Sequence, residues 1–183
     1  MKIELKNIKI NLTFSEETIM FMADLAINGV IVGEAENDGR GGCTFYGAKG
    51  YDVKKQEFLS DEIRQRNRDI ISQAEIFCKN LPKTKYDFGL GEMEMEQTLE
   101  SVIDNLVTAE VEKKEKKKFE KKMSNHIFWG IPNGHSYTQV KFKIPLKQIP
   151  LVRLQSVINK YKAELKEGEV FLNTNLEELG VKI

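Results

Sequence analysis

Residues 19–36 read IMFMADLAINGVIVGEAE, two apolar runs separated by Asn28-Gly29. Asparagine and glycine both accept the positive φ angles of a type I′ turn, so this pair between apolar runs is a strong hairpin signal. The stretch therefore predicts two antiparallel strands joined by a tight turn. A sheet, and not a helix, is expected at the front of the chain.

The segments on either side of this hairpin extend the sheet. Between Ile3 and Phe14 apolar residues recur at nearly every second position, and the slip in this alternation at Lys6-Asn7 indicates a bulge. After a glycine-rich connection, residues 43–46 predict a further strand. The first 50 residues are thus expected to form an antiparallel meander.

Helical patterns occupy the middle of the chain. Apolar residues at helical spacing predict a helix that starts near Asp52 or near Ser60 and ends before Pro82. Residues 83–91, with Tyr86 and Phe88, are expected to pack over the core as an ordered loop. A second helix is predicted from about residue 92 to residue 122.

The last third returns to strands and then to a helix. Residues 126–131 and 137–144 predict a second hairpin with its turn at 132–135. A helix is expected from about Pro150 to Gly168, followed by two short apolar pieces. The fold class is α+β: an antiparallel sheet from the N-terminal meander and the second hairpin, covered by two or three helices. One domain spanning residues 1–183 is predicted, with a lysine-rich helical arm around 110–123.

Composition narrows the function classes. The chain has 28 Lys and Arg against 28 Asp and Glu, a net charge of zero, which argues against wholesale binding to nucleic acid or membrane and leaves room for a local basic patch. No secretory signal, no apolar run of membrane-spanning length and no disulfide framework is found. A cytoplasmic protein is therefore expected.

The glycine-rich connection is the first candidate site. Consecutive positive φ angles can turn backbone N–H groups toward an anion, and an arginine adds charge. The residues of this hypothetical anion site are Asn37, Asp38, Gly39, Arg40, Gly41 and Gly42. The pattern matches neither a Walker A loop nor a dinucleotide fingerprint. The structural alternative is a wide connection between antiparallel strands.

The lysine-rich arm is the second candidate site. Its residues, hypothetical contacts to nucleic acid or an acidic partner, are Lys113, Lys114, Lys116, Lys117, Lys118, Lys121 and Lys122. The alternative is a solvated helix face held by pairs four residues apart, of which Glu112 and Lys116 are one. The narrow apolar seam of this segment is provided by Phe119 and Met123.

Other reactive side chains give weaker patterns. A zinc site from Cys43, Cys78, His126 and His135 lacks the closely spaced ligand pairs of structural zinc sites. Four acids, Asp24, Glu34, Glu36 and Asp38, allow a metal site only if the fold assembles them. Three aromatic residues, Phe128, Trp129 and Tyr137, fit either a base-stacking platform or a core. No catalytic motif occurs, so no catalytic residue, metal or cofactor is assigned.

Two stretches carry a resemblance to a protein family. The chain resembles small uncharacterised bacteriophage and prophage proteins in its front part and near its end. The front part consists of residues 14–18 (FSEET), the hairpin and residues 33–42 (GEAENDGRGG), and the closing part of residues 157–161 (VINKY) and 170–174 (VFLNT). Those proteins have an N-terminal β-hairpin followed by an Asn-Asp-Gly-x-Gly-Gly loop. Where the relatives often carry histidine in the loop, this chain has Arg40.

The family has no established activity, so the resemblance implies context alone: an accessory protein in the cytoplasm of a bacterial host. The leading hypothesis is a non-enzymatic protein that binds a host factor, a defence component being one candidate. The alternatives are nucleic-acid binding by the helix at Lys113–Lys122 and nucleotide or anion binding by the loop at Asn37–Gly42. Oligomeric state is left open.

Overall fold

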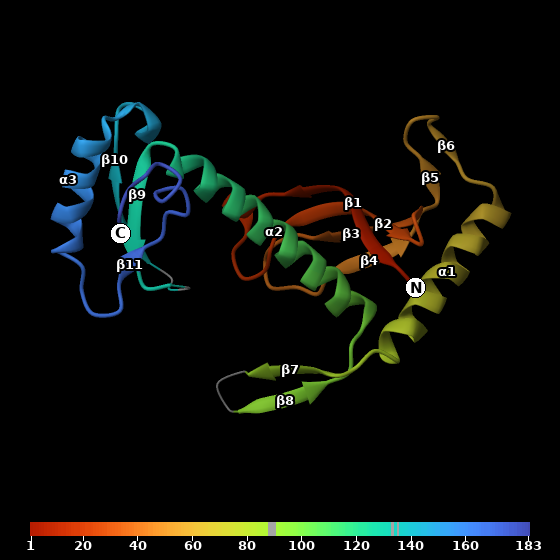
Figure 1. Ribbon diagram of the computed structural model, residues 1–183. Helices are drawn as coiled ribbons and strands as arrows, with labels where there is room; N and C mark the ends of the chain where they lie inside the picture. Colours follow the sequence, from red (N-terminus) through yellow and green to blue (C-terminus); the bar gives the residue numbers. More distant parts are fainter. Residues whose placement is uncertain (88–90, 133, 135) are drawn as a thin grey trace. The chain divides into compact units, whose positions relative to one another are not determined.

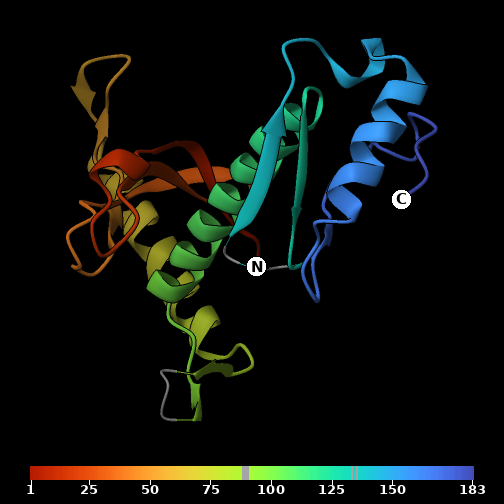
Figure 2. The ribbon, with the colours of Figure 1, turned by 90° about the vertical axis from the view of Figure 1, so that its left-hand side faces the viewer.

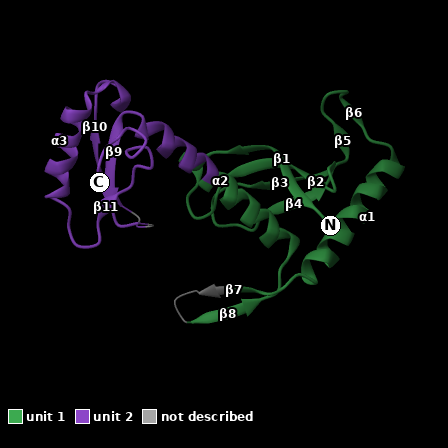
Figure 3. Ribbon diagram, viewed as in Figure 1, with its two compact units in different colours: residues 1–112 green, residues 113–183 purple. Residues whose placement is uncertain are grey.

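The protein is described by a computed structural model that covers residues 1–87, 91–132, 134 and 136–183. These residues form three α-helices and several antiparallel sheets, which confirms the predicted α+β class (Figure 1). The sequence predicted one domain, whereas the described chain divides into two compact units, residues 1–112 and 113–183 (Figure 3). Each unit has its own cluster of buried apolar side chains, which is why they separate.

Unit 1 is built on a four-stranded antiparallel sheet in the order β1-β2-β3-β4. The strands are β1 (Ile3–Ile10), β2 (Phe21–Ile27), β3 (Val30–Asn37) and β4 (Phe45–Ala48). The predicted meander is thus confirmed. Its fourth strand begins two residues later than the sequence indicated.

The hairpin between β2 and β3 has the expected turn. Asn28 and Gly29 have φ angles of 50° and 84°, the positive values of a type I′ turn, and Ile27 pairs with Val30. The predicted irregularity in β1 is also present. The register with β2 shifts after Lys6, where Asn7 has a φ of 53°.

Two helices contribute to the core of unit 1. Helix α1 (Asp61–Lys79) and the first half of helix α2 (Leu99–Met123) pack apolar side chains on inward residues of β2 and β3. Ser60 caps α1 by accepting the N–H of Ile63, so the later of its two predicted starts is right. Cys78 is fully buried in this core.

Two small hairpins correct the sequence-based expectations. Residues 51–58 pair as β5 (Tyr51–Asp52) and β6 (Glu57–Phe58). The segment expected to be a loop and the start of a helix instead pairs as β7 (Thr84–Asp87) and β8 (Glu92–Met95). Alternation of Glu and Met in residues 92–95 has the period of a strand, and α2 begins only at Leu99. Phe88 lies outside the described residues.

Unit 2 is a three-stranded antiparallel sheet between two helical segments. The sheet has the order β10-β9-β11, formed by β9 (His126–Gly130), β10 (Tyr137–Lys141) and β11 (Val170–Phe171). The predicted second hairpin is confirmed, and it belongs to this separate sheet. Figure 2 shows the strands between the C-terminal half of α2 and helix α3 (Leu151–Lys162). Asn133 and His135, in the predicted turn, are outside the described residues.

Helix α3 starts as predicted and ends earlier. Pro150 occupies its N-cap position, and the helix closes at Ala163. The expected end at Gly168 is wrong, because Gly168 has a φ of 81° in a separate turn in which Glu169 donates its N–H to the carbonyl of Lys166. Within the described ranges, no helix combines the length and the apolar character that a membrane span requires.

Candidate functional site

The glycine-rich loop, residues 37–42, folds on itself and on the segment before β2. Three of its backbone N–H groups donate to side chains: Gly39 to Asn37 at 2.8 Å, Arg40 to Asp38 at 3.1 Å, and Gly41 to Thr18 at 3.2 Å. The carbonyl of Gly39 accepts the N–H groups of residues 16–18. An anion-binding nest needs such N–H groups for its ligand. These bonds favour the structural role of the loop.

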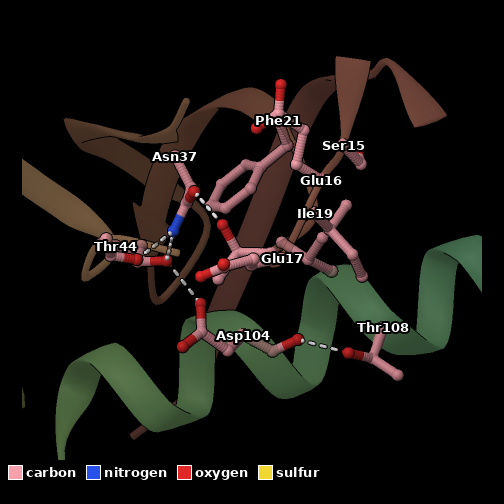
Figure 4. Close-up of a pocket in the computed structure, with 12 residues that line it drawn as sticks. Ser15, Glu16, Glu17, Ile19, Phe21, Asn37, Thr44, Asp104 and Thr108 are labelled. Carbon is pink, nitrogen blue, oxygen red and sulfur yellow. Dashed lines mark hydrogen bonds between the residues drawn. The ribbon is translucent and has the colours of Figure 1, made fainter. Parts of the chain in front are cut away.

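A cavity of about 450 Å³ lies beside this loop (Figure 4). Segment 15–21, the loop and helix α2 contribute its walls. The residues that line it are Ser15, Glu16, Glu17, Thr18, Ile19, Phe21, Asn37, Gly42, Thr44, Asp104, Val107 and Thr108. The charged side chains among them are carboxylates. A cavity of this charge repels anions, so it too disfavours the anion hypothesis for Asn37–Gly42.

One chain of hydrogen bonds links the loop to α2. Thr18 donates its hydroxyl to Asn37 at 2.8 Å, and the Asn37 amide donates to the hydroxyl of Thr44 at 3.2 Å. Thr44 donates its hydroxyl to Asp104 at 2.5 Å and its N–H to Glu100 at 2.9 Å. Burial raises the pKa of Asp104, and the neighbouring Glu100 carboxylate adds to this, against the lowering effect of the Thr44 bond.

One side of the C-terminal half of α2 packs on the sheet of unit 2. The ring of Phe119 lies 4.4 Å from that of Phe128 and 5.4 Å from that of Tyr137, measured between centroids. Met123, one turn further on the same side, is 5% exposed. This apolar seam fixes which side of the helix faces the sheet and leaves the opposite side to solvent.

Six lysines occupy the side opposite this seam. Successive residues of an α-helix are rotated by about 100°, so residues four apart form rows along one face. The two neighbouring rows are Lys113, Lys117 and Lys121, and Lys114, Lys118 and Lys122, all exposed. We call these six residues the lysine face. Lys116, Glu115 and Glu120 lie on the other half of the helix circumference.

The lysine face contains like charges spaced four residues apart along the helix. Like charges four residues apart are destabilising by about 0.2–0.5 kcal/mol per pair, and the two rows contain four such pairs. In the described structure, Lys117, Lys118, Lys121 and Lys122 form no ion pair. A face that only kept the helix soluble would gain by alternating Lys with Glu. The arrangement concentrates positive charge on one side of the helix.

Known proteins do not assign a function to this surface. No family model, no curated protein and no solved structure matches this chain.

Zero net charge conceals a strong asymmetry between the units. Residues 113–183 contain fifteen Lys and Arg against seven Asp and Glu, a net charge of +8. Residues 1–112 contain thirteen against twenty-one, a net charge of −8. The whole-chain balance, which argued against nucleic acid, is therefore no guide to unit 2. Counting charges on either side of residue 112 would have found this from the sequence.

The other reactive side chains do not form a metal centre among the described residues. Cys43 is exposed, Cys78 is buried, and His135 lies outside the described part of the chain. Asp24 and Glu34 are cross-strand neighbours that share Lys49, at 3.3 and 3.7 Å. These two acids therefore neutralise a lysine on the sheet.

The aromatic residues of the second hairpin do not form a joint platform. Phe128 and Trp129 are neighbours in β9, so they point to opposite faces of the sheet, and both are buried. Phe128 packs against Phe119 with its ring tilted by 39°, while Trp129 stacks on Tyr161 of α3 with the ring centroids 4.7 Å apart. Tyr137 alone is substantially exposed. Core packing is thus the role of Phe128 and Trp129.

Proposed function

We propose that this protein binds nucleic acid through the phosphate backbone, using the lysine face of α2. The observation that carries the proposal is the placement of six lysines on one half of a helix whose other half is anchored by Phe119 and Met123. Unit 2, which includes these six lysines, has a net charge of +8. Together they supply the electrostatic footprint expected of such proteins.

Lysine is suited to this kind of contact. Its ammonium is a compact charge on a flexible stem, so it meets phosphates without a fixed geometry. Each phosphate neutralised releases condensed counterions, which favours binding at low salt. Phosphate contacts position a protein on its ligand and read no sequence. The proposed binding is therefore independent of sequence and steeply dependent on salt.

The direct test is a titration of labelled DNA and RNA with the whole chain, followed by fluorescence anisotropy at two salt concentrations. Binding is expected at low salt and should weaken strongly at the higher concentration. A variant with Lys117, Lys118, Lys121 and Lys122 replaced by Gln should lose most of the affinity. Absence of binding to every nucleic acid at low salt would overturn the proposal.

A matched control removes the same charge elsewhere in unit 2. Lys143, Lys147, Lys162 and Lys166 are exposed and lie outside the lysine face. Replacing these four with Gln lowers the charge of unit 2 by the same amount. The control should retain most of the affinity if the arrangement on α2 matters, and should match the α2 variant if only net charge does.

Binding of a host factor, with a defence component as candidate, stays a prediction that rests on the resemblance to phage proteins. The lysine face would fit an acidic host protein by the same charge. Affinity capture from a bacterial lysate treated with nuclease separates the two ideas, because contacts bridged by nucleic acid are lost on nuclease treatment. Recovery of one acidic protein, with no nucleic-acid binding in the titration, would favour the host factor.

A further inference from the structure

The lysine face has a symmetrical layout around the helix axis. By the rotation of about 100° per residue, Lys114 and Lys121 lie near its centre. Lys113 and Lys117 lie toward one edge, and Lys118 and Lys122 toward the other. The outermost lysines, Lys113 and Lys122, are about 180° apart, so they point in opposite directions across the helix. A flat surface would meet the central lysines and miss both edges.

A groove would place phosphates of its two walls beside the two edges and its floor of base edges beside the central lysines. An α-helix with its side chains is about 10–12 Å across, and the major groove of B-form DNA is about 12 Å wide. The lysine face extends over residues 113–122, about 14 Å at 1.5 Å per residue. That length corresponds to about four base pairs at 3.4 Å each.

Other nucleic acids fit this face less well. The major groove of A-form RNA is too narrow and deep for side chains to read. Proteins that bind single-stranded nucleic acid combine a basic groove with aromatic side chains on which the bases stack. The lysine face contains no aromatic residue, and Phe119 lies on the opposite side of the helix against Phe128. It also has no Asn or Gln for bidentate contacts to adenine.

We infer that the ligand of the lysine face is B-form duplex DNA, with this half of α2 lying in the major groove and its two lysine edges on opposite phosphate walls. This inference rests on the proposed function and names the ligand class of the same site. The phosphate contacts of the two edges read no sequence. Its two-sided geometry distinguishes it from a helix that lies along the outside of the duplex.

Two pairs of substitutions test the two-sided contact. Lys113→Gln with Lys117→Gln removes one edge, and Lys118→Gln with Lys122→Gln removes the other. Each pair should weaken binding to duplex DNA on the order of tenfold or more at moderate salt, and by similar factors, because each removes two phosphate contacts. A large loss for one pair and none for the other would overturn the placement in a groove. Circular dichroism checks that both variants keep their helix content.

The deciding experiment compares four ligands of equal length with the whole chain: duplex DNA, duplex RNA, single-stranded DNA, and duplex DNA with bulky groups on pyrimidine C5. That carbon faces the major groove, so the substituents fill the groove and leave the phosphates in place. Unmodified duplex DNA should bind at least about tenfold more tightly than the other three, since they lose contacts to one or both walls.

The outcomes separate this inference from the proposed function. Equal affinity for modified and unmodified duplexes, or tighter binding of RNA, overturns the major-groove assignment and leaves binding to nucleic acid standing. Failure of all four ligands to bind at low salt overturns both.

Discussion

The hydroxyl of Thr44 donates a hydrogen bond of 2.5 Å to the carboxylate of Asp104, sixty residues further along the chain. Thr44 is 6% exposed and precedes β4, whereas Asp104 lies in the first half of α2. The same hydroxyl accepts from Asn37, and the Thr44 N–H donates to Glu100. Thr44 therefore joins the glycine-rich loop to the helix whose other half carries the lysine face.

Replacing Thr44 with Val should destabilise unit 1. The substitution keeps the shape of the side chain and removes the hydroxyl. The partly buried Asp104 carboxylate then loses the hydrogen bond from Thr44, and the Asn37 amide keeps only its bond to the carbonyl of Gly42. Such losses cost about 1–3 kcal/mol, and chemical denaturation measures them. Thr44→Ser restores a hydroxyl and should recover much of the difference. Equal stability of the Val variant and the wild type would show that the bond contributes nothing.

Alkaline pH should weaken unit 1 through Tyr46. Burial and the hydrogen bond of 2.9 Å to Glu75 raise the pKa of Tyr46 to about 12, from about 10 in the unfolded chain. Because the folded pKa is the higher one, this stability is complete below pH ~10 and is lost as the pH rises toward ~12. The loss is on the order of 1 kcal/mol, since solvent screens a partly exposed group.

Denaturation curves between pH ~10 and ~12 test this, with Tyr46→Phe as the comparison. The Phe variant has no phenol at this position, so its stability should fall less over the same interval. Parallel curves for the two proteins would contradict the role given to Tyr46.

Gly33→Ala should be strongly destabilising. A Cβ at Gly33 would clash with the backbone carbonyl oxygen of Gly47 in the neighbouring strand, and it would also meet the side chain of Ile71. Backbone in a sheet cannot move aside, so the cost should be about 1–3 kcal/mol or more, measured by thermal unfolding. Gly42→Ala is the control, because nothing lies within 4 Å of a Cβ there and its φ is not positive. Similar melting temperatures for both variants would contradict the clash.

Phe119→Ala should loosen the lysine half of α2 from its sheet. The substitution removes the ring that contacts Phe128 and Tyr137, at a cost of about 2–4 kcal/mol for a large apolar side chain. Hydrogen exchange should report faster exchange in residues 113–123 and in β9. Phe45→Ala, at a residue 74% exposed in unit 1, is the matched control and should change little. Unchanged protection in α2 would show that the seam does not anchor the helix.

Local patterns made the strands of unit 1 predictable. Asn28-Gly29 predicts a turn and the slip at Lys6-Asn7 predicts a bulge, each from a few neighbouring residues. The structure has the turn and the bulge at these positions. The segment at residues 92–95 was misassigned because its Glu-Met alternation is short and precedes a long helical pattern without a break. The segment becomes a strand by pairing with β7, and no pattern of neighbouring residues predicts this pairing.

In the candidate sites too, the sequence showed the residue types, whereas their arrangement depends on contacts between distant parts of the chain. The lysines were visible in the sequence, but their separation into a lysine face and an anchored side depends on the packing of Phe119 against β9 and β10. The bond between Thr44 and Asp104 joins distant positions and could not be foreseen. The N–H groups of the glycine-rich loop are occupied by side chains, among them that of Thr18, which lies far from the loop in sequence.

The slope of binding affinity against salt measures how many lysines meet phosphates. For the wild type and duplex DNA, the logarithm of the association constant should fall linearly with the logarithm of salt concentration, with a slope of about −4 to −5 for four to six contacts. Replacing Lys117, Lys118, Lys121 and Lys122 with Gln should make the slope shallower by about 3 to 4, while the control with Gln at residues 143, 147, 162 and 166 keeps the wild-type slope. An unchanged slope in the α2 variant, or a slope near zero in the wild type, would contradict phosphate binding by the lysine face.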